Sequence, residues 1–378
     1  MEALGLRGGR LVLPDAVVPG DLLVQDRRIA AVGEGVARRA PRALDVSPLY
    51  VAPGFLDLQA NGALGQTFLT APAEGIRAIL DFFARHGTTG LLATLTPAPW
   101  AELRAALARL RGIAHPLLLG VHLEGPFLAE GQRGAHPQAY LRPPCEAAAR
   151  DLLGEFGSLI RLWTLAPELP GALEVLRALR EKGVVGAAGH SEASYVEACR
   201  AFAAGVALVT HLFNGMRPFH HREPGLVGAA LEREVFVSLI CDGIHVHPAV
   251  LRLVTKWKGF DCLILVTDAV APTGLPDGDY ELFGRRVRVE GGAPRLPDGT
   301  LAGSTLTLDR AVRNFWEFTG CSLPEAVRCA TLNPARLLGI DDRKGSLAPG
   351  KDADLVIFDE DLTVHYTIVG GRIVYQRE

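Results

Sequence analysis

The chain has 378 residues, of which 48% are hydrophobic and 21% are charged, and its formal net charge is −3. This is the composition of a globular protein with a large core, and the small negative charge excludes the basic field that nucleic-acid binding requires. No apolar run reaches the ~18 residues that span a membrane, and the six cysteines are scattered, so we predict a cytoplasmic protein with neither a membrane nor a nucleic acid as its partner.

Short β-rich segments lie at both ends of the chain. They are Arg10–Val12, Asp21–Val24, Arg28–Val32, Ala353–Asp359, Thr363–Ile368 and Arg372–Tyr375. Gly370-Gly371 between the last two is a hairpin signal. Neither set is large enough for a core of its own. We therefore predict that residues 1–52 and 345–378 pair into one small β-sandwich domain.

Between these ends, short apolar runs alternate with helical patterns. The eight expected strands are Tyr50–Leu58, Thr88–Thr96, Leu117–Leu123, Leu159–Leu165, Val184–Ala188, Val206–Thr210, Val235–Ile240 and Cys262–Thr267. Amphipathic helices are expected at Ala73–His86, Trp100–Arg111, Leu173–Lys182 and Ser194–Ala204. Strands that are apolar throughout and alternate with helices favour an α/β fold, here a TIM-type (β/α)8 barrel over residues 53–344.

Two further features bear on this fold. A doubly wound sheet is the alternative to a barrel, but no GxGxxG pattern follows the first expected strand. The stretch Gly274–Gly299 is rich in Gly, Pro and Asp, and it predicts an inserted hairpin.

Polar side chains follow four of the expected strands at their C-terminal ends. Glu124 follows the third strand, His190 the fifth, His211 the sixth and Asp268 the eighth. One such His is usually a hydrogen-bonding residue and one such Asp is often a helix N-cap, but in a barrel these four positions meet at one rim. Two imidazoles and a carboxylate are the ligands of a catalytic zinc site. An Asp that is not a ligand is then available to accept a proton from the attacking water.

Nine segments carry a family resemblance. They are PGFLDLQANG (Pro53–Gly62), HLEGPF (His122–Phe127), GAH (Gly134–His136), GHS (Gly189–Ser191), THLFNGM (Thr210–Met216), HREPGLVG (His221–Gly228), DGIHV (Asp242–Val246), TDA (Thr267–Ala269) and LAGS (Leu301–Ser304). In this order they resemble the amidohydrolase superfamily and, within it, the N-acetylglucosamine-6-phosphate deacetylase family. The resemblance runs nearly end to end.

The resemblance implies a homodimer that hydrolyses N-acetyl-D-glucosamine 6-phosphate to D-glucosamine 6-phosphate and acetate, in amino-sugar catabolism or recycling. It implies that Glu124, His190 and His211 hold the metal and that Asp268 is general base and then general acid. His136 would contact the acetyl carbonyl and help to polarise it. The residues implied to bind the phosphorylated amino sugar are Ala135, His136, Asn214, Gly215, Arg222, His245, Leu301, Ala302 and Gly303.

Some of these roles have simpler alternatives. His136 could be a solvated loop residue, and Arg222, which follows His220 and His221, could be exposed surface. We favour Arg222 as a phosphate contact because a phosphate monoester suits a bidentate, permanently charged donor, and the resemblance implies that the partner subunit supplies it. Of the HxH pair, we expect His245 to contact the substrate and His247 to begin a helix beside Pro248.

Gln59-Ala60-Asn61 departs from the superfamily. Many amidohydrolases carry an HxH after the first strand that binds a second metal, but amides are poor ligands for transition metals, and Glu124 stands where others have a bridging lysine. We therefore predict one divalent ion per subunit, with Zn²⁺ favoured and Fe²⁺ or another divalent ion as the alternatives. One rival function is another cyclic-amide hydrolase, such as a dihydropyrimidinase or dihydroorotase, but these would carry the HxH and the lysine. The other is a non-catalytic scaffold.

Overall fold

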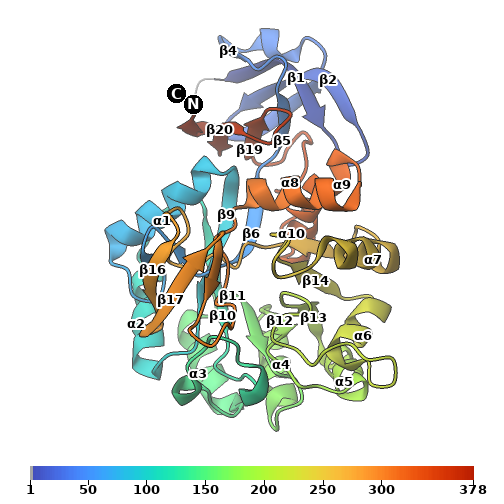
Figure 1. Ribbon diagram of the computed structural model, residues 1–378. Coiled ribbons are helices and arrows are strands. Elements are labelled where there is room, and N and C mark those ends of the chain that lie inside the picture. The colour runs from blue at the N-terminus through green and yellow to red at the C-terminus, as the bar shows by residue number, and fades with distance from the viewer. Residues whose placement is uncertain (1–2) are drawn as a thin grey trace.

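The computed structural model describes residues 3–378, and its two ends meet in one sheet. The strands of this sheet are β1 (Leu4–Val12), β2 (Val17–Gln25), β3 (Arg28–Gly33), β4 (Arg42–Asp45), β5 (Tyr50–Pro53), β19 (Leu355–Phe358), β20 (Val364–Val369) and β21 (Arg372–Gln376). Their order is β21-β20-β19-β5-β1-β2-β3, with β4 beside β1. Figure 1 shows these blue and red strands together at one end of the molecule. The sheet has its own core, in which Leu22 from one end of the chain and Leu355 from the other are buried.

Eight parallel strands form the second large sheet. They are β6 (Phe55–Ala60), β9 (Thr88–Leu95), β10 (Leu118–Glu124), β11 (Ile160–Leu165), β12 (Val185–Ala188), β13 (Val206–Val209), β14 (Phe236–Leu239) and β15 (Leu263–Leu265). Neighbours pair in chain order from β6 to β15. The circle closes because the Asp268 N–H donates to the Gln59 carbonyl (2.8 Å) and the Asn61 N–H to the Ala269 carbonyl (2.7 Å). The predicted α/β barrel is confirmed, and the doubly wound alternative is wrong.

The first expected strand needs a correction. Tyr50–Leu58 is not one strand, because β5 lies in the terminal sheet and β6 in the barrel. The chain passes from one sheet to the other at Gly54, where a Cβ would lie only 2.1 Å from the Thr89 side chain. Both halves are buried, so burial does not separate them. The Pro53-Gly54 pair, which commonly marks a turn, is the sequence feature at which the two strands divide.

Helices follow the barrel strands and cover them (Figure 1). They are α1 (Ala73–Arg85), α2 (Trp100–Arg111), α3 (Glu146–Phe156), α4 (Ala172–Glu181), α5 (Tyr195–Ala204), α6 (Gly225–Glu232), α7 (Pro248–Lys258), α8 (Leu308–Thr319), α9 (Leu323–Cys329) and α10 (Leu332–Leu337). The four expected helices are present, and α5 begins after Ser194, which forms a capping box with Glu197. Within the described part of the chain, no helix is long and apolar enough to cross a membrane.

A small three-stranded sheet is inserted between β15 and α8, where a hairpin was expected. Its strands are β16 (Gly278–Leu282), β17 (Arg285–Glu290) and β18 (Ala293–Arg295). Leu282 and Val287 pack with Ala135, Val270 and Ala302 in a separate buried cluster. This cluster fixes the inserted sheet to three loops at the C-terminal rim of the barrel. A short hairpin, β7 (Gly62–Ala63) with β8 (Gln66–Thr67), follows β6 at the same rim.

Candidate active site

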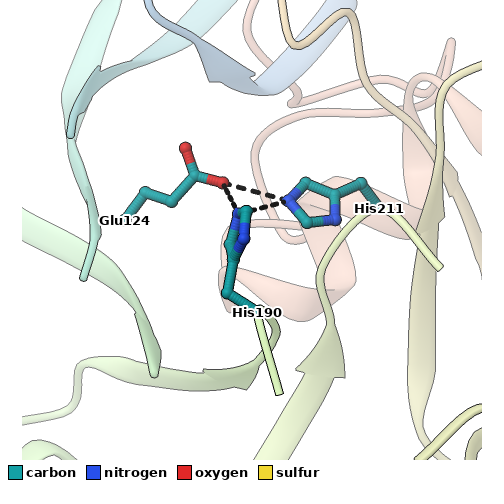
Figure 2. Close-up of side chains that lie close together, drawn as sticks. All are labelled: Glu124, His190 and His211. Carbon is teal, nitrogen blue, oxygen red and sulfur yellow. Dashed lines mark hydrogen bonds and ion pairs between the residues drawn. The ribbon is translucent and has the colours of Figure 1, made fainter. Parts of the chain in front are cut away.

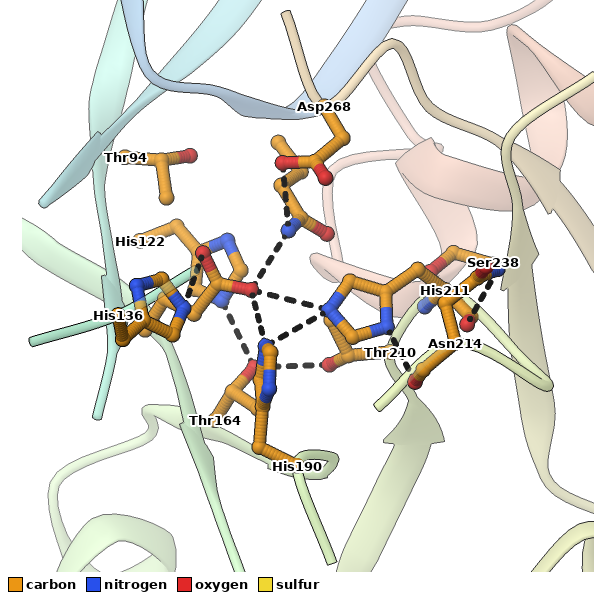
Figure 3. A network of polar contacts seen from close by, with 12 residues as sticks. Thr94, His122, His136, Thr164, His190, Thr210, His211, Asn214, Ser238 and Asp268 are labelled. Atoms are coloured by element: carbon orange, nitrogen blue, oxygen red, sulfur yellow. Dashed lines mark hydrogen bonds and ion pairs between the residues drawn. The ribbon is translucent and has the colours of Figure 1, made fainter. Parts of the chain in front are cut away.

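The four rim residues converge as the barrel geometry requires. Glu124 ends β10, and His190, His211 and Asp268 follow β12, β13 and β15. The last three have positive φ angles of 48°, 34° and 49°. Such backbone costs of order 1–3 kcal/mol at a non-glycine residue and is concentrated at functional sites. Here the strand ends turn sharply, and all four side chains point to one centre, as Figure 3 shows for Asp268, His190 and His211.

Glu124, His190 and His211 have the donor geometry of a metal site. The Nδ1–H of His190 donates to the Gln132 carbonyl (2.8 Å) and that of His211 to the Asn214 carbonyl (3.1 Å). Both Nε2 atoms therefore carry lone pairs. These atoms lie 3.2 and 3.0 Å from Glu124 Oε1 and 3.1 Å from each other (Figure 2). Two lone pairs and a carboxylate oxygen within 4.8 Å of one another fit a divalent cation.

The electrostatics of this trio favour a charged carboxylate. Burial alone would raise the pKa of Glu124, but His190 and His211, when their Nε2 atoms carry hydrogens and donate to it, hold it well below 4.5. Burial would lower the pKa of His211, but Glu124 raises it. The pocket therefore holds a negative charge between two imidazoles, which suits a cation.

His122, to which the sequence analysis gave no role, supports the floor of the site. Its Nδ1 contacts the Leu58 carbonyl (3.1 Å) and its Nε2 the Thr164 hydroxyl (2.8 Å), and Thr164 in turn bonds Thr210 (2.7 Å). Figure 3 shows this chain beneath the metal ligands. Burial lowers the pKa of His122 to about 4, so the ring is neutral. Its contacts link β6, β10 and β11, and the Thr164–Thr210 bond extends the link to the end of β13.

Asp268 stands apart from the metal ligands and is held by two amides. Gln59 Nε2 and Asn61 Nδ2 both donate to Asp268 Oδ1, at 3.1 and 2.9 Å. Burial, together with the charge of Glu124, raises the pKa of Asp268 to about 6. A buried carboxylate whose pKa lies near neutrality is suited to taking up a proton and returning it.

A cavity of about 240 Å³ opens over these residues. Of the residues predicted to bind substrate, seven line it: Ala135, His136, Asn214, Gly215, His245, Leu301 and Gly303. Ala302 is buried in the cluster beneath the inserted sheet. Arg222 is exposed, bonds His221 and does not line this cavity. Other residues that line the cavity, and that the sequence did not predict, include Thr96, Thr300 and Phe283.

Three further histidines that the sequence analysis singled out, His136, His245 and His247, differ in environment. His136 is buried, and burial together with His190 lowers its pKa to about 3, so the ring is neutral. Its Nδ1 has no hydrogen-bond partner among the described residues, and Phe283 packs on the ring at 5.8 Å between centroids. His245 donates from Nδ1 to Asp242 (2.6 Å). His247 is the N-cap of α7 and accepts from the Ala249 N–H, so the prediction for His247 is confirmed.

The chain is similar to known proteins over nearly its whole length. The amidohydrolase family model matches residues 50–374. The chain is similar to the N-acetylglucosamine-6-phosphate deacetylase of Bos taurus, with 39% identity over 100% of this chain and 92% of the relative.

Two solved structures have the same fold. One is the deacetylase of that name from Pasteurella multocida, with a TM-score of 0.94, 30% identity and coverage of 99% of this chain and 100% of that chain. The other is a mutant of the Mycobacterium smegmatis deacetylase in complex with N-acetyl-D-glucosamine-6-phosphate, with a TM-score of 0.93, 35% identity and 100% coverage of both chains.

Proposed function

The chain belongs to the amidohydrolase family and, within it, to the N-acetylglucosamine-6-phosphate deacetylases, and we propose that it hydrolyses N-acetyl-D-glucosamine 6-phosphate to D-glucosamine 6-phosphate and acetate. The observation that carries this proposal is the convergence of Glu124, His190 and His211 with Asp268 at one cavity. Three ligands and a separate base are the parts that amide hydrolysis requires. A similar protein binds this substrate in its solved structure.

The metal in this proposal is a single divalent ion held by Glu124, His190 and His211. Its donor set of two imidazole nitrogens and one carboxylate oxygen favours Zn²⁺, with Fe²⁺ as the alternative. When bound, such an ion supplies Lewis acidity, which polarises a carbonyl and makes water acidic near neutral pH. Gln59 and Asn61 turn N–H groups, not lone pairs, toward Asp268, and this supports one ion and not two.

The protein's own groups then divide the proton transfers. Asp268 takes a proton from the water that attacks the acetamido carbon, and His136 lies where a neutral ring can hydrogen-bond the carbonyl oxygen. Asp268 returns the proton to the departing nitrogen, so that the amino sugar leaves as a neutral amine. Both steps need one oxygen of Asp268 to face the scissile bond.

Substrate recognition in this proposal uses both subunits of a dimer. Asn214, Gly215, His245, Leu301 and Gly303 line the cavity and would surround the sugar phosphate. Arg222 would reach the phosphate of the partner's substrate. A cytoplasmic location remains a prediction from the sequence.

One assay separates this proposal from its rivals. Purified wild-type protein loaded with Zn²⁺ is incubated with N-acetylglucosamine 6-phosphate or with hydantoin, and acetate and ring-opened product are measured. We expect stoichiometric acetate from the sugar and no opening of hydantoin. Opening of hydantoin without acetate release would identify a cyclic-amide hydrolase, and no reaction with either compound would support a scaffold.

A further inference from the structure

Gln59 and Asn61 contact Asp268, and the proposed function does not say what holds this residue in place. The two residues lie two positions apart, Gln59 near the C-terminal end of β6 and Asn61 directly after it, with 1% and 4% of their surfaces exposed. Asp268 follows β15, the last strand of the barrel, whereas β6 is the first. The two strand ends meet where the barrel closes, so the amides reach the carboxylate across the seam.

All the side-chain hydrogen bonds of Asp268 to described residues fall on one oxygen. Oδ1 accepts from Gln59 Nε2 at 3.1 Å and from Asn61 Nδ2 at 2.9 Å. An ionised carboxylate only accepts hydrogen bonds, so both amides must present their N–H ends to it. The second oxygen, Oδ2, is thereby kept free of these donors.

Gln59 also ties the base to the metal site. Its Nε2 has two hydrogens, and the second donates to Glu124 Oε1 at 2.8 Å. One amide nitrogen thus bridges a metal ligand and the general base. This arrangement fixes the position of Asp268 relative to Glu124 without placing a charge between them.

The side-chain amide of Asn61 is satisfied at only one of its two polar atoms. Its Oδ1 is buried and has no hydrogen-bond partner among the described residues. Leaving such an acceptor unpaired costs about 1–3 kcal/mol. The contact to Asp268 is therefore the chief polar interaction of the Asn61 side chain, and a leucine of similar size would avoid the cost.

We propose that Gln59 and Asn61 form an amide clamp on Asp268 Oδ1 that leaves Oδ2 to make both proton transfers. This inference rests on the proposed function, because it assigns positioning residues for the same hydrolysis. The clamp gives Asp268 a fixed orientation through two neutral donors. A misplacement of about 1 Å in such a group costs on the order of 100-fold in rate.

The kinetic test uses Asn61→Leu and Gln59→Met, which remove the donors with little change in volume. We expect kcat to fall about 10- to 100-fold for each, with KM within about threefold of the wild-type value because the clamp acts on the proton-transfer group. Metal content is measured alongside, because Gln59 also contacts Glu124. Asn61→Ala replaces the leucine variant if that variant fails to fold.

Two readouts separate positioning from a structural role. In an Asp268→Asn background the same substitutions should lower the residual rate by less than about twofold, because no base remains to be positioned. The Tm of Asn61→Leu should stay close to that of the wild type, because the hydrogen bond lost from Asp268 is offset by removal of the unpaired Oδ1 acceptor. A similar loss of rate in both backgrounds, a wild-type kcat in either single variant, or a loss that follows metal content would overturn the clamp.

A crystal structure of the Gln59→Met/Asn61→Leu double variant supplies a readout that needs no activity. The Asp268 carboxylate should leave its wild-type position, and an unmoved carboxylate would overturn the inference. If Asp268 moves but the wild-type protein releases no acetate, the proposed function fails while the clamp stands. If acetate is released and Asp268 does not move, the clamp alone fails.

Discussion

Asp268 carries the proton-transfer steps of the proposed hydrolysis, although it is not a metal ligand. In Asp268→Asn, the amide oxygen is still able to accept the hydrogen bonds from Gln59 and Asn61, but the group no longer takes up a proton. We expect kcat to fall about 10³-fold, with the metal retained because Glu124, His190 and His211 are unchanged. Steady-state kinetics and elemental analysis check this, and a rate within tenfold of the wild type would contradict the role of Asp268.

Substitution of His190 should remove the metal, unlike substitution of Asp268, because His190 belongs to the metal site itself. Its Nδ1 is committed to the Gln132 carbonyl and its Nε2 faces Glu124. We expect one equivalent of metal per wild-type chain and, in His190→Ala, loss of both metal and activity. His247→Ala is the matched control, because His247 caps α7 and does not line the cavity. Two tightly bound equivalents in the wild type would refute the single-ion site.

At the scale of elements, Asp57 joins the first barrel strand to the segment after the last. Its Oδ2 bonds the Thr267 hydroxyl (2.6 Å), and its Oδ1 accepts from the backbone N–H groups of Gln59 and Thr267. Burial raises the pKa of Asp57 to about 7. The folded protein therefore holds a proton on this carboxyl that the unfolded chain releases near pH 4.

The consequence is a stability that depends on pH in a defined direction. Because the folded-state pKa is the higher one, the contribution of Asp57 is fully present below about pH 4 and declines as pH rises to about 7. Asp57→Asn resembles the protonated carboxyl at every pH. The free energy of unfolding of this variant, relative to that of the wild type, should therefore increase from pH 4 to pH 7, by up to about 4 kcal/mol. Urea unfolding at four pH values, with metal content held equal, measures this gain. Parallel pH curves would contradict it.

The sequence reveals elements well and contacts between distant elements poorly. The position of Glu124, His190, His211 and Asp268 after apolar strands was enough to predict a shared rim, because parallel strands of a barrel end at one face. The hydrogen bonds of Gln59 to Asp268 span 209 residues, so the sequence showed only that a metal-binding HxH was missing.

Other site features were hidden for different physical reasons. The division of Tyr50–Leu58 at Gly54 coincides with a Pro-Gly pair in the sequence, but the close approach of Thr89 to Gly54 is a contact between strands that a linear pattern does not contain. Phe283 reaches the cavity from the turn between β16 and β17 with a φ of 54°. A large apolar residue in a left-handed turn conformation is uncommon. The sequence therefore did not indicate that Phe283 lies in this turn and reaches the cavity.

At the scale of the whole molecule, the charge of the substrate exceeds what one chain provides at its cavity. Among the described residues, those lining the cavity include no Lys or Arg. Arg222 lies on the exposed loop between β13 and α6, together with Phe219, whose side chain is 50% exposed. An exposed aromatic residue beside a cation is typical of an interface, and it supports a partner subunit covering this loop.

Mixed dimers provide a direct test of that arrangement. Asp268→Asn and Arg222→Ala inactivate a site by different routes, so a dimer of the two has one intact site only if Arg222 acts across the interface. Co-expressed at equal levels, the two variants should recover about one quarter of wild-type activity at low substrate, because about half of the dimers are mixed and each has one complete site. Each variant alone is the control. If Arg222 served its own subunit, both sites of the mixed dimer would be defective and no activity would be recovered.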